Sequence, residues 1–314
     1  MKRNVLTRQA FAGVALVALA LTGCSSNPAG GGEGKELSGA VKIDGSSTVA
    51  PLSEAAAELY SDEQPQVKVG VGTSGTGGGF EKFCAGETDI SDASRAIKDE
   101  EKETCEKNGI TPVQLTVAND ALSVVVSKDN DWVDCLTVPQ LKKIWEPGSK
   151  VKSWNEIDPK FPNEPLKLYG PGTDSGTFEY FTKAINGEEK ASRTDYEPSE
   201  DDNVLVQGVA STKGALGYFG FTYYEENADK LKALKVDGGD GCVEPSVASA
   251  QDGSYKPLSR PLFIYANAKS LEKAQVKDFV RFYIENIDAV VKEANYVPLT
   301  DEQKKTLADE FAAI

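Results

Sequence analysis

The chain has 314 residues with 49 acidic and 34 basic side chains, no histidine and a formal net charge of −15. This acidic balance disfavours binding to nucleic acid or to an anionic membrane surface. The missing histidines exclude Ser-His-Asp and Cys-His nucleophile systems and histidine-based zinc hydrolysis. A carboxylate-based enzyme stays possible, but we expect no catalytic residue, no metal and no cofactor.

Residues 1–23 have the pattern of a secretory signal, a basic start followed by an apolar run that ends in small residues. The run is too short for a membrane span and is soon followed by polar sequence. Residues 21–24 (Leu-Thr-Gly-Cys) resemble the bacterial lipobox, which implies cleavage before Cys24 and attachment of lipid, including palmitate, to that residue. Residues 24–37 then form a flexible tether. The alternative is ordinary secretion with an incidental thiol at Cys24.

After the tether, strand and helix patterns alternate, which indicates an α/β fold with a parallel sheet flanked by helices. The chain is long enough after the signal to favour two domains. In the first, the patterns predict strands at 40–45 and 66–71, helices at 50–60, 80–85 and 97–109, and an extended segment at 113–126.

A second unit is expected from residue 122 onward. Its predicted elements are a short helix at 137–145 with Thr137 as N-cap, a loop at 146–165, a strand at 166–170, helices at 178–185 and 203–211, a strand and turn at 214–224, and a strand at 232–236.

The last part of the chain is predicted to return to the first unit through a strand at 258–266 and to close with one long amphipathic helix around 276–287. We therefore expect lobe 1 to comprise 38–121 and 258–314 and lobe 2 to comprise 122–257. Two linker strands, crossing near 118–121 and 257–262, would permit hinge closure around a ligand.

Four cysteines remain beyond the lipidation site, and an even number in an exported chain indicates disulfides. Four cysteines allow three connectivities. We favour Cys84–Cys105 within one unit and Cys135–Cys242 within the other. A metal site is disfavoured because the chain has no CxxC spacing and no histidine.

Three runs of Ser, Thr and Gly, at 45–48, 72–79 and 172–177, each lie between a predicted strand and a predicted helix. Helix N-termini carry unpaired N–H groups and about half a positive charge, so three such turns indicate a socket for a small anion. Residues 70–75 also match GxGxxG, with Asp89 and Asp92 near the spacing of a ribose-binding acid. A lone match is weak, and an exported protein would rarely meet a dinucleotide.

Several segments, taken together and in order, closely resemble the phosphate-binding lipoproteins of bacterial high-affinity phosphate ABC transporters, the PstS family. They are IDGSSTVAPLSEAAAE, VGTSGTGGGFEKFCAGETDISDASRAI, YGPGTDSGTFEYFTKAI, GALGYFGF and LSRPLFIYA. The resemblance implies a two-lobed periplasmic-binding-protein fold of type II, with a mixed sheet in each lobe and two hinge strands. It implies a non-enzymatic, monomeric binding subunit that captures inorganic phosphate and delivers it to membrane permease subunits. Such a protein would be held on the extracytoplasmic face of the cell membrane only by its lipid.

The family's phosphate ligands can be carried over one position at a time. In the first turn they fall on Ser47, Thr48 and the backbone N–H of Val49, in the second turn on Ser74, between the second and third turns on Asp92 and Arg95, and in the third turn on Ser175, Gly176 and Thr177.

Two of these positions carry particular chemistry. Asp92 would accept the proton that phosphate carries and sulfate lacks, and would repel a fully ionised oxyanion. Many members have an arginine four residues before the third-turn serine, where this chain has Pro171, so Arg95 is inferred to provide the guanidinium instead.

Simpler interpretations exist for the same residues. The serines and threonines of the first and third turns could be N-caps alone, and Asp92 could be a cap. Arg95 could form an exposed ion pair with Glu100, Glu101 or another nearby acid. The alternative functions are a receptor for sulfate or molybdate, an extracellular phosphatase-like enzyme, and an adhesive or sensory lipoprotein.

Overall fold

The structure, a computed structural model, describes residues 36–313. The predicted signal, Cys24 and most of the predicted tether lie outside the described residues. Leu37, the last residue of the predicted tether, donates its N–H to Gln64 Oε1 at 2.9 Å and packs on the neighbouring hydrophobic core. The folded part of the chain therefore includes the end of that segment.

Within residues 36–313, nine strands form one sheet, and three form a smaller one. The large sheet contains β1 (Gly39–Gly45), β2 (Val67–Gly72), β3 (Ile90–Ala93), β4 (Pro112–Ser127), β6 (Lys167–Pro171), β7 (Glu197–Ser199), β8 (Ala215–Gly220), β9 (Leu231–Ala233) and β12 (Ser259–Asn267). Its order is β2-β1-β3-β12-β4-β8-β6-β7, with β9 also paired to β4. The small sheet has β10 (Lys235–Asp237) between β11 (Cys242–Val243) and β5 (Cys135–Thr137). Parallel pairs at both ends of the large sheet flank three central antiparallel pairs, β3–β12, β12–β4 and β4–β8.

Helices of varied length connect these strands. They are α1 (Ala50–Glu63), α2 (Gly75–Cys84), α3 (Asp99–Lys107), α4 (Val138–Trp145), α5 (Trp154–Ile157), α6 (Gly176–Phe181), the π-helical η1 (Thr182–Asn186), α7 (Asp202–Ala210), α8 (Phe221–Glu226), α9 (Val247–Gln251), the 3₁₀-helical η2 (Ser270–Glu272), α10 (Ala274–Glu285), α11 (Ile287–Glu293) and α12 (Asp301–Ala312). No helix within residues 36–313 is both long and apolar enough to cross a membrane.

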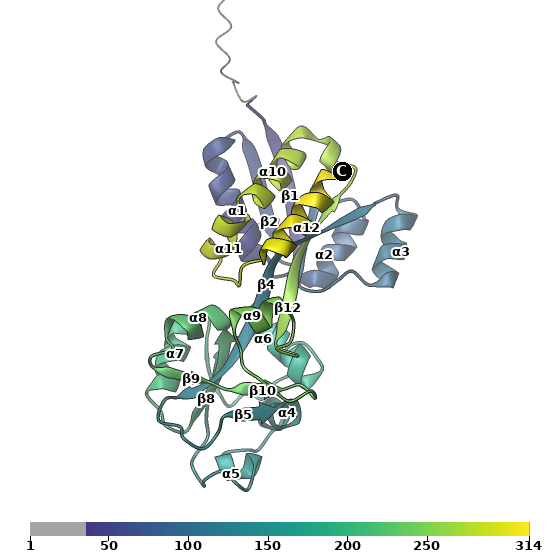
Figure 1. The fold of residues 1–314 in the computed structure, drawn as a ribbon. Helices are drawn as coiled ribbons and strands as arrows, with labels where there is room; N and C mark the ends of the chain where they lie inside the picture. The colour runs from purple at the N-terminus through teal and green to yellow at the C-terminus, as the bar shows by residue number, and fades with distance from the viewer. Residues whose placement is uncertain (1–35, 314) are drawn as a thin grey trace, which may run out of the picture. The chain divides into compact units, whose positions relative to one another are not determined.

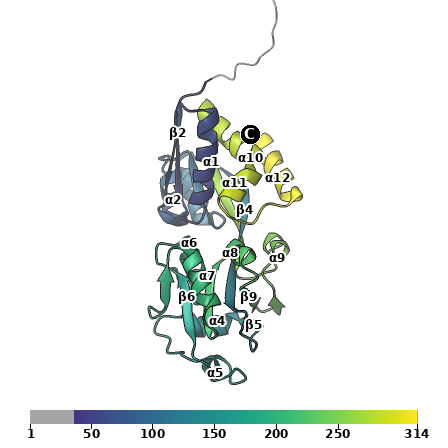
Figure 2. The ribbon, with the colours of Figure 1, turned by 90° about the vertical axis from the view of Figure 1, so that its left-hand side faces the viewer.

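Two large hydrophobic cores divide the chain. The first core collects buried residues from 41–118 and 262–307, and the second core collects buried residues from 122–258. In the first core, α1 packs against α10 and α11, which lie together in Figure 2. Burial of these apolar faces, rather than helix propensity, provides most of the stability of such elements.

Strands β4 and β12 are the connection between the two cores, and they run side by side in Figure 1. On β4 the chain leaves the first core after Ala118 and joins the second at Leu122. On the way back it leaves the second core after Leu258 and joins the first at Leu262.

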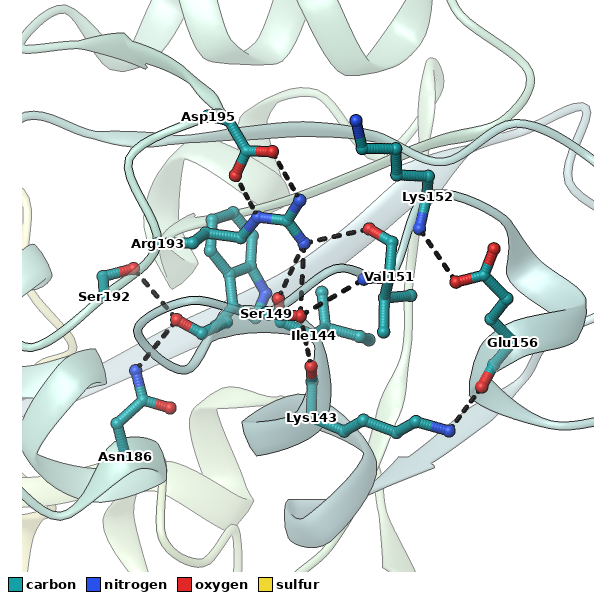
Figure 3. A network of polar contacts seen from close by, with 11 residues as sticks. Lys143, Ile144, Ser149, Val151, Lys152, Glu156, Asn186, Ser192, Arg193 and Asp195 are labelled. Atoms are coloured by element: carbon teal, nitrogen blue, oxygen red, sulfur yellow. Dashed lines mark hydrogen bonds and ion pairs between the residues drawn. The ribbon is translucent and has the colours of Figure 1, made fainter.

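A buried arginine fastens the loops of the second core. Arg193, only 5% exposed, makes a two-pronged ion pair with Asp195 and donates to the carbonyls of Ile144 and Val151, both at 3.0 Å. Figure 3 shows how this guanidinium joins the end of α4 to the loops on either side of it. Since both of its terminal nitrogens are bonded, its role here is structural.

The predicted disulfides Cys84–Cys105 and Cys135–Cys242 are both present, so the favoured connectivity is confirmed. The first joins α2 to α3, and the second joins β5 to β11. Each therefore lies within one region of the fold.

Two predicted elements were wrong in extent. Helix α2 begins at Gly75, not at residue 80, because its glycines allow a close approach: a Cβ on Gly79 would lie 2.5 Å from the Cα of Gly45 in β1. The chain also does not close with one helix, since α11 and α12 follow α10. Their faces complete the first core through residues such as Val290 and Leu307.

Candidate anion-binding site

A cavity of about 280 Å³ lies at the N-termini of α1 and α6. Its lining comes from elements of both cores and includes two acidic side chains, Asp120 and Asp202, and Tyr223. Five of the nine predicted ligands line it, namely Ser47, Thr48, Ser175, Gly176 and Thr177. The structure thus brings the first and third turns together, although they are about 130 residues apart in the chain.

The first turn is held by hydrogen bonds to strand β3. Ser46 N–H donates to the carbonyl of Asp92 at 2.9 Å, and the Ser46 hydroxyl oxygen accepts from Thr48 N–H at 3.2 Å. Val49 N–H, a predicted phosphate donor, is bonded to the Ser46 carbonyl at 3.1 Å, and Val49 is fully buried. Its N–H therefore stabilises the turn in this structure.

The hydroxyl of Thr48 has a defined direction. Its oxygen accepts a hydrogen bond from Arg260 Nη2 at 3.0 Å. A hydroxyl that accepts through its oxygen keeps its own proton for another acceptor. Because Thr48 lines the cavity, that proton is available to an anion within it.

The third turn meets the first at very short range. Ser175 is the N-cap of α6 and accepts from Thr177 N–H at 3.2 Å, which leaves the serine proton free to donate. A Cβ on Gly176 would lie 2.6 Å from Thr48 Oγ1 and 2.9 Å from Thr48 N. Only glycine allows the two helix N-termini to approach so closely.

A carboxylate already occupies one donor at this junction. Ser47 Oγ donates to Glu179 Oε2 at 3.2 Å, and Glu179 Oε1 pairs with Lys190 at 3.0 Å. The contact joins a residue next to α1 to a residue of α6. An oxyanion that takes the Ser47 hydroxyl must replace Glu179 as its acceptor.

In the second turn, the predicted phosphate ligand Ser74 is bonded to a neighbouring carboxylate. Ser74 donates both its hydroxyl and its N–H to Asp44 Oδ1, at 2.5 and 3.1 Å, and Asp44 also pairs with Lys82. Burial raises the pKa of Asp44, but the bonds from Lys82 and Ser74 outweigh it and lower the pKa overall. Ser74 is not part of the cavity lining.

Asp92 lies beneath the first turn rather than in the cavity lining. Its side chain is fully buried, and Oδ1 accepts from the Ser53 hydroxyl of α1 at 2.8 Å. Oδ2 is buried and has no hydrogen-bond partner among the described residues. Burial raises the pKa of Asp92 to about 8, and the nearby Asp44 and Glu54 add to the rise. The carboxyl is therefore mostly protonated at neutral pH.

Arg95 is bound by a carboxylate. Its Nη1 and Nη2 donate to the two oxygens of Glu101 at 2.8 and 2.7 Å, the pairing that the sequence offered as the simpler interpretation. Neither residue lines the cavity. Pro171, the position at which the family resemblance implied an arginine, ends β6, and its carbonyl accepts from the Tyr196 hydroxyl at 2.9 Å.

A different arginine, Arg260, contacts two residues of the cavity lining, although it is not itself one of the lining residues. It lies opposite Asp120 in the β12–β4 pair and donates from Nε to Asp120 Oδ2 at 3.1 Å. Sequence reasoning missed it, although it belongs to the segment 258–266 that carried part of the family resemblance. The available signal was a basic residue on a predicted linker strand.

Two carboxyl groups of the lining have raised pKa values. Burial raises the pKa of Asp120 despite the opposing effect of Arg260. Burial, with the charges of Asp201 and Glu200, raises the pKa of Asp202 to about 6. Raised values favour the neutral acid, which repels an anion less than a carboxylate does. No group of acidic or cysteine side chains suited to a metal ion occurs within residues 36–313.

Comparison with known proteins identifies the fold. Residues 28–286 match a family model described as a PBP superfamily domain. The structure superposes on a possible phosphate binding protein from Planctomyces limnophilus with a TM-score of 0.85 and 47% identity, over 88% of this chain and 99% of that one. The protein thus has the type II periplasmic-binding-protein fold.

Relatives found by sequence comparison narrow the superfamily to one family. Protein SphX of Synechocystis is 46% identical over 92% of this chain and 84% of its own length. The phosphate-binding protein PstS of Staphylococcus saprophyticus is 42% identical over 97% of this chain and 94% of its own length. The chain belongs to the PstS family of phosphate-binding proteins, whose members are transport receptors and not enzymes.

Replacing Gly176 by alanine tests the contact between the two N-termini. The added Cβ would clash with Thr48, so we expect phosphate affinity to fall about tenfold or more, the scale of an overpacking penalty. The control is Gly70→Ala, since a Cβ there meets no heavy atom within 4 Å. Titration calorimetry of both variants measures the effect, and unchanged affinity in Gly176→Ala would contradict it.

The raised pKa of Asp92 predicts an unusual pH dependence of the free energy of unfolding. The unfolded carboxyl ionises near pH 4, whereas the folded one keeps its proton to about pH 8. The wild-type free energy of unfolding should therefore fall as pH rises through this window. Asp92→Asn removes the titration, so its stability relative to wild type should increase from about pH 4 to about pH 8.

Denaturant unfolding in phosphate-free buffer measures this difference. Asp99→Asn, whose parent side chain is 99% exposed, provides the control. Parallel pH profiles for wild type and Asp92→Asn would show that the buried carboxyl does not behave as described.

Proposed function

We propose that this protein is the extracytoplasmic phosphate receptor of an ABC importer, which binds inorganic phosphate at the cavity and delivers it to membrane permease subunits. The observation that carries the proposal is the junction of two hydroxyl-bearing helix N-termini, those of α1 and α6, at one cavity. Solved relatives support it, among them a putative phosphate ABC transporter substrate-binding protein from Clostridium perfringens with bound phosphate, 26% identical with a TM-score of 0.58.

The donors at this junction suit a tetrahedral oxyanion. Thr48 and Ser175 each accept a hydrogen bond through the hydroxyl oxygen and keep a proton to donate. The helix N-termini add partial positive charge where an anion would lie. These local groups must attract the anion against the negative net charge of the chain.

Closure follows from the connection between the cores. In this proposal, lobe 1 (38–121 and 258–314) and lobe 2 (122–257) move about strands β4 and β12. The N-terminus of α1 belongs to the first region and that of α6 to the second, so an anion bound to both would favour the closed arrangement. Because Ser47 must exchange Glu179 for the ligand, binding replaces one contact between the regions with another.

We also propose that a lipid attaches the receptor to the membrane. Cleavage before Cys24 and lipidation of that residue would hold a monomeric receptor at the extracytoplasmic face. The segment between Cys24 and the folded part of the chain would then act as the tether. The lipobox-like residues 21–24 support this part.

Calorimetry with phosphate and with sulfate tests the function. We expect a dissociation constant near micromolar, about −8 kcal/mol, which eight to ten hydrogen bonds can provide after desolvation and closure costs. Sulfate should bind at least about tenfold more weakly, since it carries no proton for a carboxyl group to accept. Absence of phosphate binding would reject the function, and comparable sulfate binding would reject the selectivity.

Asp92 remains our proposed origin of that selectivity, in its ionised form, which a bound phosphate would favour by donating its proton to the carboxylate and which sulfate could not. Its support is Oδ2, a buried oxygen without a partner in the described part of the chain, directly beneath the first turn. Asp92→Asn should reduce the ratio of phosphate to sulfate affinity about tenfold or more. Because the stability of the same variant relative to wild type is expected to rise toward pH 8, an unfolding measurement at that pH separates a loss of fold from a loss of selectivity. An unchanged ratio would remove Asp92 from the mechanism.

A further inference from the structure

A guanidinium is the group best matched to an oxyanion, because its N–H groups can form two parallel bonds. The described part of the chain contains four arginines, Arg95, Arg193, Arg260 and Arg281. Their partners decide which of them is available at the cavity.

Three of the four are committed to carboxylates away from it. Arg95 pairs through both terminal nitrogens with Glu101, so the edge that would receive an oxyanion is filled. Arg193 is bound to Asp195 and to carbonyls near the end of α4. Arg281 bridges two acidic neighbours on α10. None of these partners lines the cavity.

Arg260 contacts two residues of the lining. Nε donates to Asp120 at 3.1 Å and Nη2 to Thr48 at 3.0 Å, while Nη1 donates to the carbonyl of Ser94 at 3.4 Å. A guanidinium has five N–H groups, so these bonds leave one on each terminal nitrogen. An oxyanion could accept hydrogen bonds from these remaining N–H groups.

The surroundings fix Arg260 between the two regions of the fold. Its side chain is only 16% exposed, and its Cζ lies 3.5 Å from the ring centre of Tyr180, a residue of α6. Tyr180 is itself held by a bond from its hydroxyl to the carbonyl of Pro257 at 2.8 Å. Thr48, in contrast, belongs to the turn before α1. The guanidinium therefore contacts both the turn before α1 and the body of α6.

We propose that Arg260, not Arg95, supplies the guanidinium of the phosphate site and orients the Thr48 hydroxyl toward the ligand. The inference rests on the proposed function. Arg260 lies on β12, one of the two strands that connect the cores, so it stays near both helix N-termini as they separate or meet. Arg260 then binds the anion directly and keeps Thr48 a donor.

Calorimetric titration of phosphate compares wild type with Arg260→Gln, Arg260→Lys, Arg95→Gln and, as an unrelated surface control, Arg281→Gln. Arg260→Gln should weaken binding about 100-fold or more, the loss of two charge-assisted bonds. Arg260→Lys should retain part of the affinity, because an ammonium is a point charge without the fork. Arg95→Gln and Arg281→Gln should stay within about threefold of wild type.

Removing Arg260 alone leaves Asp120 buried and unpaired, which can unfold the protein. The double variant Arg260→Gln/Asp120→Asn avoids this, because guanidinium and carboxylate leave together. It should fold and still bind phosphate about 100-fold more weakly, although a carboxyl group has also left the cavity.

The charge of the ligand distinguishes direct binding by Arg260 from a merely structural role of this residue. Measured at about pH 6 and about pH 8, loss of a guanidinium should weaken binding of the dianion more than that of the monoanion. A structural defect would weaken both equally, and that result would overturn the inference. So would phosphate binding that survives without Arg260 or depends on Arg95. If the wild-type protein itself does not bind phosphate, the result rejects the proposed function, whatever the role of Arg260.

Discussion

Two helix N-termini approach one another almost to contact, and the rest of the site depends on that approach. Helix ends of the same polarity carry partial charges of the same sign, so their meeting is unfavourable without a negative group between them. In this structure the Glu179 carboxylate accepts the Ser47 hydroxyl at the junction. Phosphate would satisfy the same donors better, with more acceptor oxygens in one small group.

The fold holds the junction through glycines and through one pair of strands. Gly176 lets α6 reach Thr48, and Gly79 lets α2 lie against the end of β1. Strands β4 and β12 carry the chain between the cores and place Arg260 and Asp120 opposite each other beside the cavity. The binding groups therefore come from helix ends and strands held in place by burial on both sides.

Local patterns predicted much of this architecture. Residues near in sequence decide where a helix begins, so Thr137 and Ser175 cap their helices as expected. Apolar runs predicted the crossing strands, and the disulfide pairing matched the regional division of the chain. The family resemblance directed attention to the first and third turns, which do meet at one cavity.

The choice of partner for each polar group was not predictable in the same way. Ser74 bonds to Asp44, 30 residues earlier, and Arg260 to Thr48, 212 residues away. Several acids lie close enough in sequence to claim Arg95, and Glu101 alone has the right position on α3. Such competition between donors and acceptors is decided by tertiary packing, which one sequence without its fold does not specify.

A high-resolution crystal structure of the protein with phosphate tests the central claim most directly. The account predicts the anion between the N-termini of α1 and α6, with oxygens bonded to Thr48, to the 175–177 turn and to Arg260, and with Ser47 released from Glu179. A phosphate bound elsewhere, or held by Arg95 while Arg260 stays apart, would contradict it.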